Sequence, residues 1–92
     1  MPKRVDANQP DIVRDLRQVG ASVAHTHMVG QGFPDIVVGF RGQNYLFEIK
    51  DGAKPPSKRK LTPDEEQWHL AWNGQVTVVK NINEALAAIG AI

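Results

Sequence analysis

Two apolar segments of this chain each carry charged side chains that could perform chemistry. The first, residues 32–40, contains Asp35 near its start, and the second, residues 45–50, carries Glu48 and Lys50 at its end. Side chains of an extended strand alternate between faces, so Glu48 and Lys50 share one face. If the two segments pair as a hairpin, Asp35 lies opposite the end of the second. Two carboxylates beside an ammonium inside apolar strands are costly, and a divalent cation held by oxygen ligands would compensate their charge.

This set of groups suits the hydrolysis of a phosphodiester. A cation between Asp35, Glu48 and the backbone carbonyl of Ile49 could lower the pKa of a bound water and clamp the phosphate. Lys50 could orient or help to deprotonate that water, or act as a fixed positive charge on the transition state. The alternative is structural: Asp35 ends a turn, and the other two charges belong to a solvated sheet face.

The spacing of these residues resembles the signature of a nuclease superfamily. Pro34-Asp35, a short spacer and then Glu48-Ile49-Lys50 look like the PD-(D/E)xK motif. The wider frame resembles the VRR-NUC group, the virus-type replication-repair nucleases, over about the whole chain. The further positions that carry this resemblance are Gly32, Phe33, Phe47, Leu61-Thr62-Pro63, Gln67-Trp68-His69 and Gly74.

The resemblance implies a stand-alone DNA endonuclease that depends on Mg²⁺ or Mn²⁺. Its substrate would be duplex, branched or junction DNA, its role replication, repair or recombination, and its source a phage or its bacterial host. By the family pattern Asp35 and Glu48 are metal ligands and Lys50 is the catalytic lysine. Gln67 is the glutamine that the following helix contributes to the site.

The chain departs from the family pattern near its first helix. The family places a glutamate there as a further acid of the metal site, whereas no glutamate precedes Glu48 in this sequence. Asp6, Asn8 and Gln9 lie near that position, and the sequence does not decide among them. The departure supports an alternative function, a DNA-binding module that keeps the fold without cleaving DNA. A small structural or interaction protein is a third reading.

A basic segment, residues 54–60, follows the second charged strand. It carries four positive charges and no negative one, on Lys54, Lys58, Arg59 and Lys60. Basic groups beside an active site are typical of a surface that binds the nucleic-acid backbone. Two adjacent prolines predict an extended, non-helical loop. The alternatives are a solvated loop without function and a segment that becomes ordered when DNA binds.

Composition fits a single domain that spans residues 1–92. The chain is 41% hydrophobic, which is enough for one modest core. The absence of cysteine excludes disulfides, thiolate zinc sites and cysteine nucleophiles. No apolar run approaches the ~20 residues of a membrane span, and the N-terminal residues do not form a signal peptide. We therefore expect a cytoplasmic protein with no membrane partner.

Apolar periodicity predicts the elements that position the charged residues. Residues 10–19 show helical spacing, and residues 21–28 read as a first strand. His25 and His27 share one side of that strand. We interpret them as strand-face histidines near the groove, with a DNA or phosphate contact as the lesser alternative.

The second helix has a clear start signal. Thr62 can cap it, a proline fits its first position, and Glu65 completes a capping box. Trp68 and Trp72 lie one turn apart along it, and we predict that this stripe belongs to the core. The helix would separate the three antiparallel strands of residues 21–50 from a last strand at 75–80.

The expected order is therefore helix, three strands, helix, strand, helix. The helical crossover favours parallel pairing of the last strand. This predicts an α/β fold with a mixed sheet flanked by helices, consistent with the restriction-endonuclease-like PD-(D/E)xK core. So small a domain would gain stability and a continuous DNA groove by pairing with itself, and we expect a homodimer.

Overall fold

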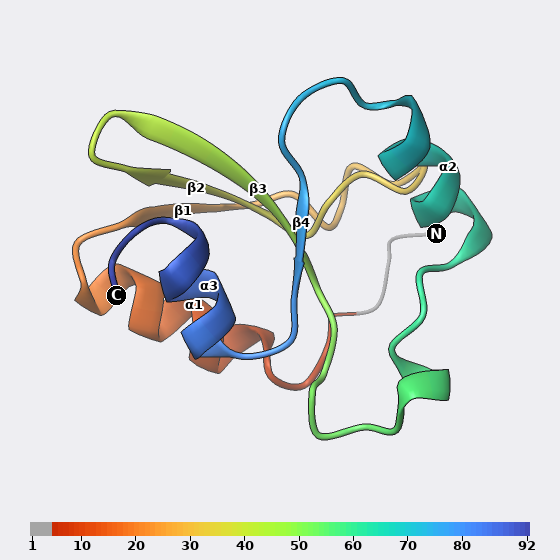
Figure 1. The fold of residues 1–92 in the computed structure, drawn as a ribbon, viewed down its shortest axis with the longest axis horizontal. Helices are drawn as coiled ribbons and strands as arrows, with labels where there is room; N and C mark the ends of the chain where they lie inside the picture. Colours follow the sequence, from red (N-terminus) through yellow and green to blue (C-terminus); the bar gives the residue numbers. More distant parts are fainter. Residues whose placement is uncertain (1–4) are drawn as a thin grey trace.

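The computed structural model describes residues 5–92, which form a four-stranded mixed sheet and three α-helices (Figure 1). The observed order confirms the expected one. In chain order the elements are α1 (Gln9–Gln18), β1 (Ser22–His25), β2 (Ile36–Phe40), β3 (Gln43–Ile49), a 3-10 helix (Pro56–Lys58), α2 (Pro63–Ala71), β4 (Thr77–Val79) and α3 (Ile82–Ala88). None of the helices within this described range is long and apolar enough to cross a bilayer.

The strands lie in the order β1-β2-β3-β4, so that β2 and β3 are central. The first three strands are antiparallel, and β4 runs parallel to β3, as the helical crossover predicts. A two-residue turn, Arg41-Gly42, joins β2 to β3. Both of its residues have positive φ angles, 51° and 80°, which is the geometry of a tight hairpin turn. The turn fixes the register of the two strands that carry the candidate site.

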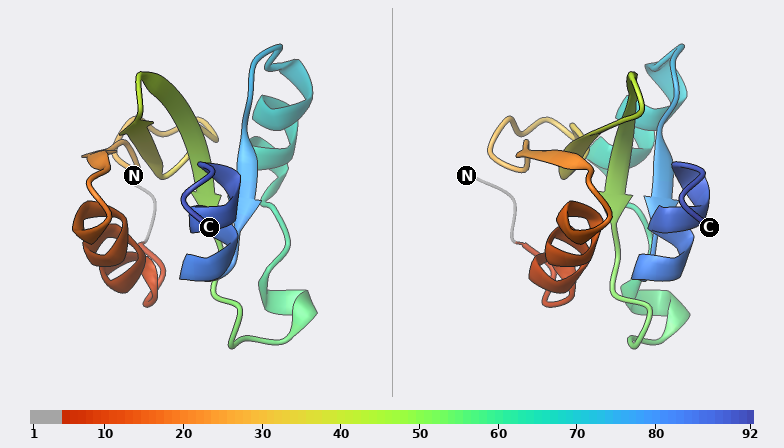
Figure 2. Two further views of the ribbon diagram at one scale, coloured as in Figure 1. Left: turned by 60° about the vertical axis from the view of Figure 1, so that its left-hand side comes forward. Right: turned by 90° about the vertical axis from the view of Figure 1, so that its left-hand side faces the viewer.

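The hydrophobic core lies on one face of the sheet. The alternating residues Ile36 and Val38 of β2 and Phe47 and Ile49 of β3 are buried there, and the apolar stripe of α1 packs onto them. Helices α1 and α3 contact each other and cover this face (Figure 2). The buried apolar residues are Ile12, Val13, Leu16, Ala21, Ile36, Val38, Phe47, Ile49, Val79, Ala85 and Ile89.

Helix α2 lies apart from this core, next to the loop of residues 26–35 (Figure 1). Gly32 in that loop has a φ angle of 82°, and a Cβ atom there would lie 2.2 Å from the backbone carbonyl oxygen of Asp64. Only glycine allows so close an approach. The loop and the first turn of α2 are therefore fixed against each other.

The tryptophan stripe is not part of the core, so that prediction was wrong. Trp72 is 44% exposed, and Trp68 is half-buried. Their rings stack on each other with centroids 4.7 Å apart, and Trp68 also meets the ring of Phe33 edge-on at 5.2 Å. The capping box at Thr62 is confirmed, and Glu65 is the buried residue of this helix. Helix α2 therefore buries Glu65 of its first turn rather than an apolar side.

Candidate functional site

Strand pairing brings the two motif carboxylates together. Asp35 directly precedes β2, whose first residue Ile36 pairs with Phe47. The Asp35 backbone N–H donates to the carbonyl of Phe47 at 3.0 Å, and its carboxylate reaches the backbone N–H of Ile49. Asp35 is 2% exposed and Glu48 is fully buried. The two carboxylates are therefore buried at the same end of the β2–β3 hairpin. Glu48 alternates with the core residues Phe47 and Ile49, so its side chain lies on the face opposite the α1–α3 core.

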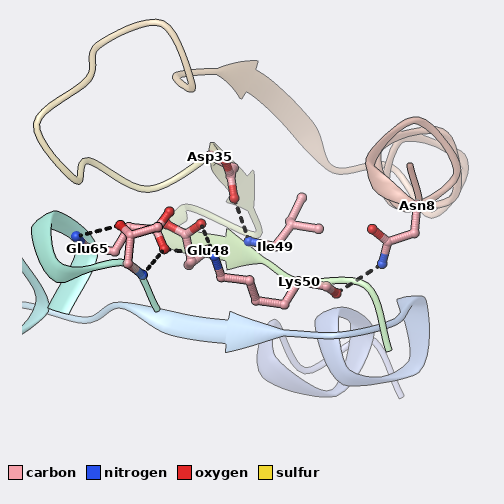
Figure 3. Close-up of polar contacts among 7 residues, drawn as sticks. Asn8, Asp35, Glu48, Ile49, Lys50 and Glu65 are labelled. Atoms are coloured by element: carbon pink, nitrogen blue, oxygen red, sulfur yellow. Dashed lines mark hydrogen bonds and ion pairs between the residues drawn. The ribbon is translucent and has the colours of Figure 1, made fainter. Parts of the chain in front are cut away.

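The backbone of Ile49 belongs to the same cluster. Its N–H donates to Asp35 Oδ2 at 2.7 Å, in a buried hydrogen bond (Figure 3). In an antiparallel ladder the N–H and the C=O of one residue point to the same neighbouring strand. The carbonyl of Ile49 therefore points toward Asp35. It must have this direction to bind a metal ion there.

Lys50 reaches two carboxylates on this face (Figure 3). Its Nζ lies 2.7 Å from Glu65 Oε1 and 3.8 Å from Glu48 Oε2, and its side chain is only 10% exposed. The backbone is held as well. Its N–H donates to the Val79 carbonyl at 3.0 Å, and its carbonyl accepts from Asn8 Nδ2 at 3.1 Å. The ammonium is thus fixed among acidic groups at the end of β3.

Glu65 is a site residue that the sequence did not reveal as one. Its capping-box role explains it locally, and the structure adds the ion pair with Lys50, since Oε1 accepts from both Thr62 N and Lys50 Nζ. Gln67, the residue expected from α2, lies exposed, with no hydrogen bond to Lys50 or the carboxylates. A helix has about 3.6 residues per turn, so a side chain two positions after Glu65 points nearly the opposite way.

The three candidates near the first helix occupy different positions. Asn8 is structural, because its Nδ2 donates to the carbonyls of Lys50 and Lys80, each at 3.1 Å. Gln9 is buried and turns toward His25, with its Nε2 3.4 Å from Nδ1 of that ring. Asp6 is the one carboxylate of the three.

The Asp6 carboxyl lies in the electrostatic field of the site. Burial raises the pKa of Asp6 above its usual value, the Lys50 ammonium opposes this, and the charge of Asp35 raises it further. Asp6 precedes α1, which begins at Gln9. Of the residues near the first helix, Asp6 is therefore the acid that could add to a charge cluster here.

The donor atoms fit a magnesium-type ion better than a zinc-type one. Within residues 5–92 no group of three His, Cys, Asp or Glu side chains is arranged to hold a metal. Asp35 and Glu48 supply carboxylate oxygens, and Ile49 supplies a backbone carbonyl. Mg²⁺ is usually bound by one or two carboxylates and keeps several waters and substrate phosphate oxygens. Asp35, Glu48 and Ile49 therefore match that ligand requirement.

The basic segment stays beside this cluster because both of its ends are fixed there. It lies in the loop between Lys50 and Glu65, and the 2.7 Å pair between these residues closes that loop. The charge of Lys54 also lowers the pKa of Asp6. Pro56–Lys58 form a 3-10 helix, so the expectation of a non-helical loop was wrong there. Proline is compatible with the first turn of a helix, and only Pro55 is extended.

The side chains of the basic segment differ in exposure. Lys54, Lys58 and Lys60 are exposed, whereas Arg59 is half-buried. The Nε of Arg59 is buried and has no hydrogen-bond partner among residues 5–92. Three ammonium groups of the loop between Lys50 and Glu65 therefore face solvent.

Replacing Glu65 with Gln tests the Lys50 ion pair. Breaking a buried pair costs about 3–5 kcal/mol, and we expect a loss of about 3 kcal/mol because Lys50 retains Glu48 nearby. The midpoint of urea unfolding would fall with little change in slope. Glu66→Gln is the control, since Glu66 is an exposed acid of the same turn and should change stability by less than about 0.5 kcal/mol. Equal midpoints for the two variants would show that the pair contributes nothing.

Comparison with family models, with curated proteins and with solved structures found no match for this chain. Its function must therefore be inferred from the site itself.

Proposed function

We propose that this protein is a divalent-metal-dependent DNA endonuclease that hydrolyses phosphodiester bonds. The observation that carries the proposal is that Asp35, whose carboxylate accepts from the Ile49 N–H, and Glu48 are both buried at one end of the central hairpin, with Lys50 Nζ 3.8 Å from Glu48 Oε2. The antiparallel meander with a parallel fourth strand supports the finer fold, a PD-(D/E)xK core of the restriction-endonuclease type. The sequence resemblance favours its VRR-NUC group.

Each residue of the cluster has a role in this proposal. Asp35, Glu48 and the carbonyl of Ile49 hold Mg²⁺ or Mn²⁺, which when bound lowers the pKa of a water and neutralises phosphate charge. The Lys50 ammonium orients the attacking water and stabilises the negative charge that develops on the phosphate. Glu65 holds that ammonium in place, since a group must be positioned closely to act in the transition state.

The proposed substrate is DNA, held through its phosphates by the basic segment. The segment presents exposed lysines in the loop that the Lys50–Glu65 ion pair closes at the cluster. A homodimer would extend this surface across the two strands of a duplex or the arms of a junction. Light scattering at micromolar concentration tests the dimer, and a monomer there would remove it. We place the activity in replication, repair or recombination in a bacterial cytoplasm.

The triple replacement of Lys54, Lys58 and Lys60 with Gln tests DNA binding by the basic segment. Each lost phosphate contact should reduce the slope of log affinity against log salt by about 0.9, or by about 2.7 for three contacts. Fluorescence anisotropy in EDTA between 50 and 200 mM KCl, roughly the range over which such contacts are lost, measures the slope. Arg41→Gln is the control, because Arg41 lies at the far hairpin turn. A slope equal to that of wild type would show that the segment is a solvated loop whose lysines do not contact DNA phosphates.

A DNA-binding module without cleavage is the second candidate. It is favoured by the absence, within residues 5–92, of three His, Cys, Asp or Glu side chains arranged to hold a metal ion, and by the ion pair that already engages Lys50 with Glu65. A panel of labelled duplexes, flaps and junctions with Mg²⁺ or Mn²⁺ separates the two. Cleavage that EDTA stops is the expected result. Binding without any cleavage would establish the module, and no metal or DNA binding would leave a structural protein.

A further inference from the structure

A cavity outside the carboxylate cluster lies between α1 and the end of β1. Its volume is about 620 Å³, within the roughly 300–1,000 Å³ of small-molecule sites. Pro10 and Val13 of α1 give it an apolar wall, and His25 and His27 line it from the other side. The two imidazole rings meet edge to face with centroids 6.0 Å apart. The cavity thus combines a flat apolar wall with aromatic rings.

Two buried polar atoms of the residues that line this cavity have no hydrogen-bond partner among residues 5–92. They are Oε1 of Gln9, a side chain only 1% exposed, and Nδ1 of His27. Buried polar atoms are nearly always bonded in folded proteins. A ligand that carries both donors and acceptors would satisfy them.

The rim of the cavity offers one arginine that no carboxylate neutralises. Arg14 pairs with Asp11 at 3.2 Å and with Asp15 at 3.0 Å. Arg17 instead donates to the backbone carbonyl of Val23 at 3.2 Å, and no carboxylate of residues 5–92 pairs with it. Its guanidinium is therefore the group at this rim that can bind an anion such as a phosphate.

The cavity and the carboxylate cluster are linked through the backbone beside the start of β2. His25 pairs with Ile36 in the sheet, and the next residue, Thr26, donates its backbone N–H to the Asp35 carbonyl at 2.8 Å. Val5 lines the cavity, whereas its neighbour Asp6 is influenced by the charges of the cluster. The cavity wall at His25 is thus joined to Asp35 through Thr26.

We infer that this cavity binds one unpaired nucleotide of the DNA beside the phosphate to be cut, an inference that rests on the proposed nuclease function. The base stacks on the histidine rings, as unstacked bases do in single-strand sites. The Gln9 amide bonds the exposed base edge, and Arg17 binds the phosphate. A paired base has its Watson–Crick edge bonded to its partner and its two faces stacked on its neighbours. Substrates with an extrahelical nucleotide, as at a bulge or branch, are therefore selected.

Binding to three DNA duplexes tests this inference. They are a fully paired duplex, the same duplex with one unpaired thymidine, and the same bulge with an abasic sugar in place of the thymidine. Anisotropy is measured in EDTA, so that neither metal nor cleavage contributes. Stacking of one base predicts about tenfold tighter binding of the thymidine bulge than of the other two.

Two exposed cavity residues provide the variants. Arg17→Gln and His25→Ala remove surface side chains, so the fold is retained, and each should abolish most of the preference for the bulge. Arg41→Gln removes an exposed arginine at the far hairpin turn and should retain the preference for the bulge. Equal affinities of wild type for the three duplexes, a preference that survives both variants, or no DNA binding at all would overturn the inference.

Failure of the nuclease proposal would look different. Bulge preference without cleavage in Mg²⁺ or Mn²⁺ would support nucleotide binding in the cavity and contradict the nuclease proposal. Cleavage without bulge preference would support the nuclease proposal and contradict nucleotide binding in the cavity.

Discussion

Lys50→Met should lower the rate of DNA cleavage by about 10²–10⁴-fold, the contribution usual for a positioned proton-transfer group. The variant loses the ammonium beside Glu48 and Glu65 but keeps Asp35 and Glu48. Metal and DNA binding should therefore stay close to wild type. Single-turnover cleavage with saturating Mg²⁺ measures the effect on chemistry alone.

A loss of stability could imitate this result, because the variant also removes the partner of a buried carboxylate. Glu65 would remain at the site without its 2.7 Å contact to Lys50. The double variant Lys50→Met with Glu65→Gln removes that buried charge, so it should recover much of the lost unfolding free energy. Its cleavage should stay as low as that of the single variant. Recovery of cleavage with stability would show that Lys50 only supports the fold.

Lys54→Met is the matched control for charge. It removes a lysine just beyond the same strand, but an exposed one. We expect a salt-dependent loss of affinity and no change in the rate of bound substrate. If Lys50→Met and Lys54→Met were equally active, the proposed catalytic role of Lys50 would be wrong.

The convergence of the motif residues was predictable because it depends on local rules. Alternation along a strand puts Glu48 and Lys50 on one face, and a tight turn sets the register that brings Asp35 to the same end of the hairpin. Both rules act within a single hairpin, so short-range patterns suffice. The parallel pairing of β4 followed from its helical crossover.

The contribution of α2 was not predictable in the same way. Glu65 fits a capping box, and that local explanation is correct but incomplete, since the same oxygen also accepts from Lys50. The second contact depends on how a loop of residues 51–64 folds back. The prediction that the two tryptophans belong to the core was wrong for a related reason. Their spacing places them on one side of a helix, but it does not show what covers that side.

The region before α1 shows a further limit of sequence patterns. Asp6, Asn8 and Gln9 are all short-range neighbours with polar side chains, so spacing alone could not rank them. The structure separates them by the groups that they meet: backbone carbonyls for Asn8, a histidine ring for Gln9, and the charges of the site for Asp6. The cavity between α1 and β1 was likewise absent from the sequence argument, since its walls come from separate elements.

The ion pair between Lys50 and Glu65 connects the proposed catalytic lysine to the proposed DNA-binding segment. Lys50 ends the strand that carries the motif, and Glu65 begins the helix that follows the basic segment. A change in that pair therefore affects both the position of the ammonium and the placement of the lysines around it. This coupling predicts that Glu65→Gln lowers DNA affinity at low salt as well as stability.

Asp35→Asn should abolish detectable cleavage and weaken Mn²⁺ binding by at least about 100-fold, since even the partners of metal ligands contribute 10–100-fold. The substitution keeps the shape of the side chain and an oxygen that can accept from the Ile49 N–H, so the strand end should remain intact. It removes one of the two carboxylate charges that the ion would meet. Isothermal titration with Mn²⁺ and cleavage of a labelled junction measure the two effects.

Asp64→Asn is the control for this change, because Asp64 is an exposed aspartate in the first turn of α2. It removes the same charge from the same part of the molecule, and it should leave metal binding and cleavage within about twofold, as surface substitutions usually do. Unfolding midpoints exclude a loss of fold. If Asp35→Asn bound Mn²⁺ and cut DNA like wild type, the buried carboxylate would serve only to hold the Ile49 N–H. Asp35 would then not be a ligand of the proposed metal site.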